Sequence, residues 1–334
     1  MTATLQAEAL FLDRDLQISI GTRDLAPPLP DETVVRVECA GLCGSDLHVI
    51  RTGDWVEAAQ WPATLGHELC GTVELAPADG SLQAGDRIVA DSRVPCDLCA
   101  ECLAGEPDRC RAIRFIGECR PGGFATRCVL PSRLLHRVPD GLAPDTAVLA
   151  EPLAVAIHAL SRLPAEPRRV AILGHGPIGA LLHIELRRCF PDADVTVAEP
   201  AALRAALAGA LGAATVAGAN RLGDDAFDTV IDAAGYGRAF TDALRLLAPR
   251  GQLLLVALGH RSTSLVPAAL VESSATIVGA NAFVDELPEA IARLAENPAR
   301  YQPVVTDAVL LEELPGVVRT QLERPDAVKV VLCP

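Results

Sequence analysis

The stretch Arg169-Val-Ala-Ile-Leu-Gly-His-Gly-Pro-Ile-Gly179 decides the fold of the second half of this chain. It begins as an apolar run typical of a buried strand and continues into a Gly-x-Gly-x-x-Gly pattern that opens a helix. This order is the fingerprint of a Rossmann unit, because the glycines let the backbone approach a pyrophosphate and the helix N-terminus holds its negative charge. The residues expected at a dinucleotide are therefore Gly174, Gly176, Pro177, Ile178 and Gly179.

An acidic residue follows the next predicted strand. Glu199 lies 25 residues after Gly174, at the end of the run 195–198. An acid at this place hydrogen-bonds the ribose hydroxyls of NAD and repels the 2′-phosphate of NADP. Arg204 offers a contact to the ribose edge and also lowers the penalty for NADP, and its alternative is a solvated helix face. We expect NAD as the cofactor, with NADP less favoured.

Strand-like and helix-like segments alternate from about residue 165. The predicted strands are 169–173, 195–198, 227–232 and 252–257, and the predicted helices are 178–189, 201–211, 239–247 and 287–296. Strands alternating with helices of this length predict a parallel sheet covered on both faces. The fold class is therefore α/β in this half, a doubly wound Rossmann domain.

The first half is β-rich. Its predicted strands are 33–38, 69–75, 87–90 and 126–130. Two further strands are predicted in the tail, at 304–310 and 328–332, and we expect the tail to return to the first domain. The predicted boundaries are 1–156 completed by 300–334 for the first domain, and 157–299 for the second.

Composition excludes several function classes. The 334 residues carry a net charge of −14, which argues against nucleic acid and anionic membrane partners and is interpreted as an acidic soluble surface. Lys329 is the sole lysine, which argues against Schiff-base chemistry and a Walker-type phosphate site. No segment reaches the ~18 apolar residues of a membrane span, and no signal peptide is recognised, so we expect a cytoplasmic protein.

Four cysteines in one short segment predict a structural zinc site. Cys96, Cys99, Cys102 and Cys110 offer four thiolates, and a site closed by four protein ligands leaves no position for a substrate. The alternative is an iron–sulfur cluster. The bacterial ferredoxin run has three residues before its last cysteine and a proline after it. Here seven residues separate the last two cysteines and Arg111 follows, so zinc is favoured.

A second set of metal ligand types suggests an open, catalytic zinc site. A catalytic zinc needs about three protein ligands and one exchangeable position. Cys43 and His67 are the expected ligands; whether Glu68 and Glu151 ligate directly, alternate, or hold a zinc-bound water stays open. Alone, His67 would more often be structural and Glu68 a solvated acid, but their place in Gly66-His-Glu-x-x-Gly71 favours the site.

Three residues that follow Cys43 are candidates for supporting roles. Asp46 is expected to orient a ligand, because metal-bound histidines usually need a second hydrogen-bond partner. Ser45 and His48 offer a hydroxyl-to-imidazole route by which an alcohol proton leaves, although His48 alone is as often a surface residue. We interpret the six remaining cysteines as reduced, small core residues; they are Cys39, Cys70, Cys119, Cys128, Cys189 and Cys333.

Together these residues resemble the zinc-dependent medium-chain alcohol dehydrogenases over nearly the whole chain. The motifs that carry the resemblance are Cys43-Gly-Ser-Asp-x-His48, Gly66-His-Glu-x-x-Gly71, the four clustered cysteines and Gly174–Gly179. The resemblance implies a GroES-like catalytic domain, a Rossmann domain, two zinc ions per chain and a homodimer or homotetramer. It also implies that the segment 256–259, with Leu258, approaches the nicotinamide.

Within that family, Glu151-Pro-Leu-Ala-Val is similar to the polyol, butanediol and sorbitol branch, whereas His48–Trp55 is similar to threonine dehydrogenases. Ser92 and Arg93 stand where the classical enzymes have an aromatic pocket, and a polar pocket suits a polyhydroxylated substrate. The leading hypothesis is NAD-dependent oxidation of a secondary alcohol on a polyol, sugar or cyclitol. Alternatives are an NADPH-dependent biosynthetic ketone reductase, a threonine or amino-alcohol dehydrogenase, and a catalytically silent relative that binds cofactor and zinc.

Overall fold

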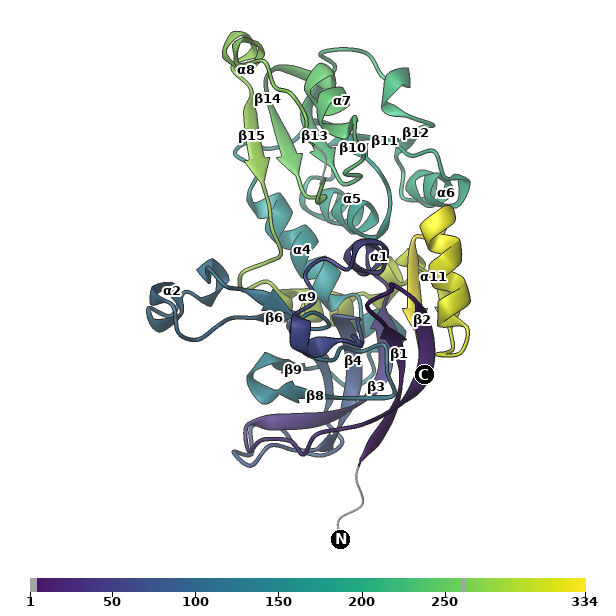
Figure 1. Cartoon of the computed structure of the whole chain (residues 1–334). Coiled ribbons are helices and arrows are strands. Elements are labelled where there is room, and N and C mark those ends of the chain that lie inside the picture. Colours follow the sequence, from purple (N-terminus) through teal and green to yellow (C-terminus); the bar gives the residue numbers. More distant parts are fainter. Residues whose placement is uncertain (1–4, 260–261) are drawn as a thin grey trace. The chain divides into compact units, whose positions relative to one another are not determined.

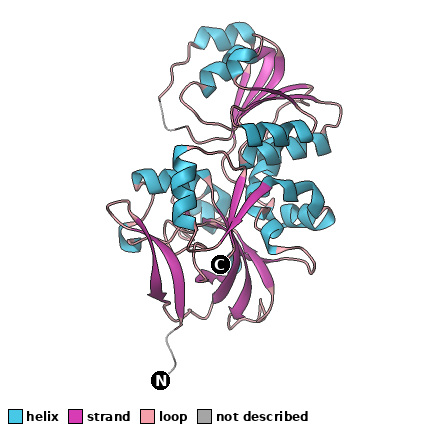
Figure 2. Cartoon of the chain, turned by 90° about the vertical axis from the view of Figure 1, so that its right-hand side faces the viewer, coloured by secondary structure: helices cyan, strands magenta, loops and turns pink. Residues whose placement is uncertain are grey.

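The computed structural model describes residues 5–259 and 262–334, and these divide into two compact units. The first unit runs up to Glu151 and also contains Leu287–Arg324 and Lys329–Pro334. The second contains Pro152–Glu286, apart from the two undescribed residues, and Pro325–Val328. Both units mix helices and strands, which Figure 2 colours separately. The fold class is α/β, as predicted.

The second unit is built on a six-stranded, all-parallel sheet in the order β12-β11-β10-β13-β14-β15 (Figure 1). Its strands are β10 (Arg169–Leu173), β11 (Asp194–Ala198), β12 (Ala214–Val216), β13 (Phe227–Asp232), β14 (Leu247–Leu255) and β15 (Thr276–Gly279). The helices that follow them are α5 (Pro177–Cys189), α6 (Ala202–Ala210), α7 (Ala239–Leu246) and α8 (Pro267–Ser273), and α4 (Ala150–Ser161) precedes β10.

The chain adds strands in opposite directions on the two sides of the β10–β13 pair: β11 and β12 follow on one side, and β14 and β15 on the other. Parallel crossovers are right-handed, so the helices after β10 and β11 cover one face and the helix after β13 covers the other. Apolar side chains such as Leu173, Val230 and Leu253 are buried between these layers. In an open α/β sheet a ligand binds beyond the carboxyl ends of the strands at the reversal point, and there the Gly174–Gly179 loop follows β10.

The first unit is built around a seven-stranded sheet with the path β16-β17-β3-β4-β5-β9, with β8 also pairing with β3. The strands of this sheet are β3 (Glu32–Gly41), β4 (Glu68–Leu75), β5 (Arg87–Ala90), β8 (Arg127–Pro131), β9 (Leu135–Arg137), β16 (Val305–Val309) and β17 (Lys329–Leu332). Two further pairs are β1 (Gln6–Leu12) with β2 (Ile18–Asp24), and β6 (Arg93–Val94) with β7 (Arg114–Phe115).

Helices of the first unit come from both ends of the chain. They are α1 (Gly44–Thr52), α2 (Ala100–Leu103), α3 (Pro144–Ala147), α9 (Leu287–Glu296), α10 (Pro298–Tyr301) and α11 (Leu314–Glu323). Among the described residues, no helix combines the length and the apolar character that a membrane crossing requires.

The boundaries of the two units differ from those expected at 156/157 and 299/300. They fall after Glu151 and after Glu286, so α9 belongs to the first unit. The sequence assigned α9 to the second domain because this helix continues the alternation of strands and helices. Its buried side chains, Leu287, Ala290, Ile291 and Leu294, instead form an apolar stripe, and the helix contacts α3 and α10.

Three strands, β17, β3 and β4, lie side by side at the carboxyl end of β3. Both β17 and β4 are antiparallel to β3, and Gly41 of β3 lies opposite Val331 on one side and Glu68 on the other. Directly opposite residues share a face of a sheet. Residues two positions along, such as Cys39 and Cys70, therefore lie on that same face.

The expectation that all six remaining cysteines are reduced is wrong. Cys39 and Cys333 form a disulfide with a Cα–Cα distance of 4.4 Å, because β17 brings the end of the chain beside β3. Cys70 and Cys128 are free, fully buried thiols, and burial raises the pKa of each to about 12. Cys189 is exposed rather than a core residue.

Candidate active site

Asp46 accepts hydrogen bonds from both segments that carry the predicted zinc ligands, the one at Cys43 and the one before His67. It lies in the first turn of α1, where its Oδ2 accepts a hydrogen bond of 2.9 Å from the backbone N–H of Cys43. Its Oδ1 accepts one of 3.3 Å from the N–H of Gly66 and lies 3.5 Å from Nδ1 of His67. Asp46 is only 3 % exposed, so this one carboxylate orients His67 as the sequence suggested.

Cys43, His67 and Glu68 converge on one place. Their sulfur, nitrogen and oxygen donor atoms all lie within 4.8 Å of one another. Burial alone would lower the pKa of His67, but the charge and hydrogen bond of Asp46, with a smaller contribution from Cys43, raise it overall. Sulfur, imidazole and carboxylate donors together suit zinc, and three protein ligands leave one coordination position for water or substrate.

Glu68 has a partner that the sequence did not reveal. The ammonium of Lys329 forms a buried ion pair with Oε2 of Glu68 and donates a hydrogen bond of 3.1 Å to the backbone oxygen of Leu42. The pair passes beside Gly41, where an added Cβ would overlap Oε2 of Glu68 and come within 2.7 Å of Lys329 Cε. The only signal in the sequence was a lysine inside an apolar strand.

Glu151 lies near this cluster but outside the group of three donor atoms. It is 7 % exposed, and its Oε1 accepts a hydrogen bond of 2.7 Å from the hydroxyl of the fully buried Ser92. Burial raises the pKa of Glu151, and the charges of His67, Glu68 and Lys329 act on it. Ser92 thus holds Glu151, whereas the neighbouring Arg93 is paired with Asp91 at 2.7 Å.

Ser45 and His48 lie one turn apart on α1. Nε2 of His48 lies 3.2 Å from Oδ2 of Asp54, and its ring is tilted against Trp55 with centroids 4.5 Å apart. No hydrogen bond joins Ser45 to His48 within the described part of the chain. A proton route through both therefore needs a water or a bound hydroxyl group between them.

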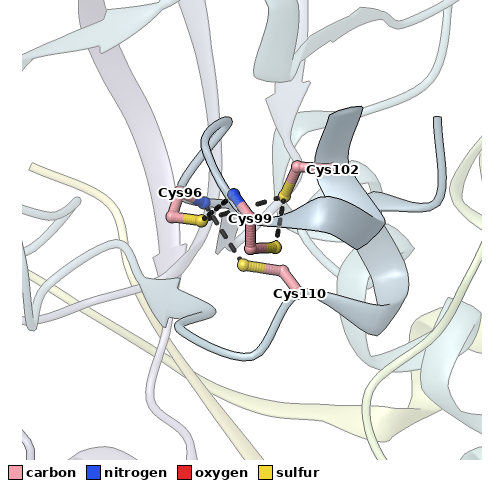
Figure 3. A group of neighbouring side chains, drawn as sticks. All are labelled: Cys96, Cys99, Cys102 and Cys110. Atoms are coloured by element: carbon pink, nitrogen blue, oxygen red, sulfur yellow. Dashed lines mark hydrogen bonds between the residues drawn. The ribbon is translucent and has the colours of Figure 1, made fainter. Parts of the chain in front are cut away.

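The four clustered cysteines converge as predicted (Figure 3). Sγ of Cys99 is 3.4 Å from Sγ of Cys102, which is 4.0 Å from Sγ of Cys96, and tetrahedral zinc–thiolate geometry separates its sulfurs by about 3.8 Å. The backbone N–H groups of Leu98 and Cys99 lower the pKa of Cys96 to about 6. Four sulfurs this close do not ionise together without a cation among them, which suits a structural zinc.

The glycine loop of the second unit has the geometry that close approach to a pyrophosphate needs. Gly174 has a φ of +86°, and an added Cβ would lie 2.8 Å from the Cβ of Ala234. At Gly179 an added Cβ would overlap the backbone oxygen of Gly174. Gly176 is the N-cap of α5 and Pro177 its first residue, so free backbone N–H groups face the loop.

Glu199 is hydrogen-bonded to this glycine loop. Its two carboxylate oxygens accept hydrogen bonds from the backbone N–H groups of His175, at 2.8 Å, and Ala201, at 2.9 Å. Nε of Arg204 donates to the backbone oxygen of Ala327 at 2.9 Å, and its guanidinium lies beside Gly176. The carboxylate thus braces the loop and keeps lone pairs for further donors.

Leu258 follows β14, beyond the carboxyl edge of the sheet. It is 59 % exposed, and the preceding Ala257 lies against Gly235, which follows β13. The two segments and the glycine loop therefore lie at the same edge of the second unit's sheet.

Comparison with known proteins places the two halves of the chain in one family. Residues 29–140 match the alcohol dehydrogenase GroES-like domain, and residues 144–332 match the glucose dehydrogenase C-terminus. The chain is 30% identical over 298 residues to D-altritol 5-dehydrogenase of Agrobacterium fabrum, covering 85% of this chain and 87% of the relative. It is 28% identical over 249 residues to L-threonine 3-dehydrogenase of Pyrococcus horikoshii, covering 70% and 71%.

A solved structure agrees with these matches. A protein named as a zinc-binding dehydrogenase of Sinorhizobium meliloti 1021, solved with NADP, superimposes with a TM-score of 0.87 at 29% identity, over 99% of this chain and 100% of the other. The chain therefore belongs to the zinc-dependent medium-chain dehydrogenases, in the branch of the polyol dehydrogenases.

Proposed function

We propose that this protein oxidises a secondary alcohol of a polyol, sugar or cyclitol, or reduces the corresponding ketone, with a nicotinamide cofactor. The observation that carries the proposal is the convergence of Cys43, His67 and Glu68 with an orienting Asp46. Such a ligand set holds zinc with one open position, which a closed structural site lacks. Family membership and the glycine loop of the second unit support the redox chemistry.

Different residues of the chain orient the metal ligands and move the alcohol proton. When bound, zinc supplies a Lewis acid that lowers the pKa of an alcohol oxygen, and the nicotinamide supplies the hydride acceptor. Asp46 fixes the orientation of His67, and Lys329 balances the charge of Glu68. Ser45 takes up the alcohol proton, and His48, held by Asp54, passes it to solvent.

We propose NAD rather than NADP as the preferred cofactor. Glu199 directly follows β11, at the place where an acid hydrogen-bonds the ribose and opposes a 2′-phosphate. Arg204, beside Gly176, contacts the ribose edge. The NADP in the structure of the Sinorhizobium relative makes a direct comparison of the two cofactors necessary.

We also propose a homo-oligomer. β15 is the edge strand of the six-stranded sheet and pairs only with β14 among the described strands. Its free backbone groups can pair with those of a second copy. Light scattering after size-exclusion chromatography tests this, and a monomer at micromolar concentration would refute it.

The experiment that tests the function is a spectrophotometric screen of the purified, zinc-loaded protein. Nicotinamide reduction is followed with NAD and NADP in parallel against polyols, cyclitols, diols, amino sugars and threonine. Turnover of polyhydroxylated alcohols with NAD supports the proposal. No turnover in either direction, with the zinc content of both sites verified, would favour a cofactor-binding relative without catalysis.

The similarity to L-threonine 3-dehydrogenase favours a second candidate, oxidation of an alcohol next to an amine. In the same screen, faster turnover of threonine than of every polyol would select it.

A further inference from the structure

The loop that contains Glu118 is fixed against the segment leading to His67. Gly122, Gly123 and Phe124 donate backbone hydrogen bonds of 2.8, 2.6 and 2.9 Å to the oxygens of residues 64, 66 and 65. At Glu118 itself, the N–H donates to Phe115 at 3.1 Å and the backbone oxygen accepts from Glu57 at 3.0 Å. The backbone at Glu118 is therefore held on both sides.

Glu118 is half-buried. The preceding Gly117 packs against the residues before the candidate ligand His67, since a Cβ added at Gly117 would lie 3.1 Å from the Cα of Leu65 and 3.4 Å from the backbone nitrogen of Gly66. Burial raises the pKa of Glu118 to about 7, and the charges of His67 and Asp46 act on it in opposite directions. Within residues 5–259 and 262–334 its carboxylate has no hydrogen bond or ion pair. The arginines of the same loop are occupied, since Arg114 pairs with Glu57 and Arg120 pairs with Glu32.

The formal charges around the candidate zinc site cancel without the carboxylate of Glu118. With zinc bound, the metal's two positive charges and that of Lys329 are balanced by the Cys43 thiolate and the carboxylates of Asp46 and Glu68. The carboxylate of Glu118 is then an additional negative charge, before Glu151 is counted. A half-buried charge without a partner is costly in free energy, and a cationic ligand removes that cost.

We propose that Glu118 is a specificity-determining residue that binds a protonated amine of the substrate. The preferred substrate is then an alcohol that also carries an ammonium group, such as an amino sugar, an aminocyclitol or an amino alcohol. This inference rests on the proposed function and narrows its substrate class. A carboxylate–ammonium hydrogen bond is stronger than one to a neutral hydroxyl, so an amine should be preferred over the matching alcohol.

The test uses pairs of substrates that differ by one amine. In each pair the amine replaces a hydroxyl: 3-amino-2-butanol with 2,3-butanediol, threonine with 2,3-dihydroxybutanoate, and glucosamine with glucose. The zinc-loaded, wild-type protein should show a higher kcat/KM for the amine of the best pair. Glu118→Gln, which keeps size but removes charge, should lower that kcat/KM on the order of 10- to 100-fold, chiefly through KM.

Two controls accompany this variant. Glu8→Gln changes an exposed acid on β1 and should leave both members of each pair unchanged. Glu118→Asp keeps the charge and should retain part of the preference for the amine. Zinc content and melting temperature of each variant show whether the fold and both metal sites are intact.

The outcomes separate the two proposals. Turnover of the diols and sugars without preference for the amine, or equal losses on both members in Glu118→Gln, would overturn the inference and leave the proposed function standing. No turnover of any pair by the zinc-loaded wild type, in oxidation or reduction, would overturn both.

Discussion

At the scale of single residues, Gly41 makes the Glu68–Lys329 ion pair possible. The two charged side chains come from β4 and β17, on either side of β3, and meet where Gly41 lacks a side chain. Burial alone would lower the pKa of Lys329, but Glu68 and Cys43 raise it overall, so the ammonium stays charged beside the candidate zinc ligands. The glycine is therefore part of the candidate metal site although it supplies no ligand.

Gly41→Ala should separate this pair. The new methyl group would overlap Glu68 and crowd Lys329, so Glu68 must shift away from the metal position. Loss of a group that supports a metal ligand typically lowers metal affinity about 10- to 100-fold. We expect the zinc content to fall from two to one per chain after mild chelation, with turnover lost in parallel, as measured by elemental analysis.

Gly316→Ala is the matched control, because Gly316 lies in α11 with nothing within 4 Å of an added Cβ. It should keep both zinc ions. Equal zinc retention in both variants would show that the crowding at Gly41 is relieved without loss of the site.

Glu199 gives a second prediction at this scale. Glu199→Ala removes the charge that opposes a 2′-phosphate, and also the acceptor for the N–H groups of His175 and Ala201. The ratio of NADH to NADPH affinity should therefore fall, on the order of 10-fold. Fluorescence titration of both reduced cofactors measures it.

Glu199→Gln keeps an acceptor for the loop, so it should change the ratio with a smaller loss of NADH affinity. Asp194→Asn, an exposed change at the start of β11, is the control. An unaltered ratio in both Glu199 variants would exclude Glu199 from cofactor selection.

At the scale of elements, we expect the loop of the four cysteines to depend on a bound metal for its order. Leu98 and Leu103 are 82 % and 76 % exposed, so the loop buries little apolar surface of its own. Besides the sulfurs, the loop is held by the short helix α2, by the β6–β7 pair at its base and by ion pairs at its surface. The pairs Arg111–Glu101 and Arg133–Asp97 are solvent-exposed on the arginine side and contribute little to stability. A segment with so few apolar contacts needs a cross-link to compensate its lost conformational entropy.

Cys102→Ser should release this zinc and loosen the loop. Trypsin should then cleave after Arg109 or Arg111, whereas the zinc-loaded wild type resists cleavage there. The rate of appearance of the two fragments, followed by mass spectrometry, measures the effect. Cys189→Ser, which replaces an exposed free thiol, should cleave like the wild type. Resistance in Cys102→Ser would mean that the loop is ordered without its metal.

At the scale of the whole molecule, we expect the two units to bind different groups, the metal in the first and the cofactor in the second. The candidate zinc ligands Cys43, His67 and Glu68 belong to the first unit, and the glycine loop with Glu199 belongs to the second. No ligand of the candidate zinc site comes from the second unit within the described chain. Metal binding and cofactor binding should therefore respond independently to substitution.

Cys43→Ala tests this separation. Loss of the thiolate should abolish turnover, because the open zinc site needs its ligands. The affinity for NADH should stay within about twofold of the wild type, because every residue that we propose to hold the cofactor belongs to the other unit. Calorimetric titration with NADH measures the affinity. Unchanged turnover would refute the zinc mechanism, and a large loss of NADH affinity would refute the independence of the units.

The sequence by itself determined those features whose chemistry is local. The spacing from Cys96 to Cys110 predicts a closed metal loop, and the glycine spacing after an apolar run predicts a Rossmann loop, because both depend on neighbours in the chain. The predicted strand Phe227–Asp232 and helix Leu287–Glu296 have the observed bounds. The roles expected for Ser45, His48 and Arg204 remain predictions.

Only the tertiary structure decided which distant residues meet. Lys329 reaches Glu68, and Cys333 reaches Cys39, because β17 returns almost 300 residues later to pair with β3. Ser92 holds Glu151, and the loop of Glu118 packs against the residues that precede His67, through segments that carry no recognisable pattern. Spacing along a chain encodes neither strand order nor loop path, since both arise from packing of the whole sheet.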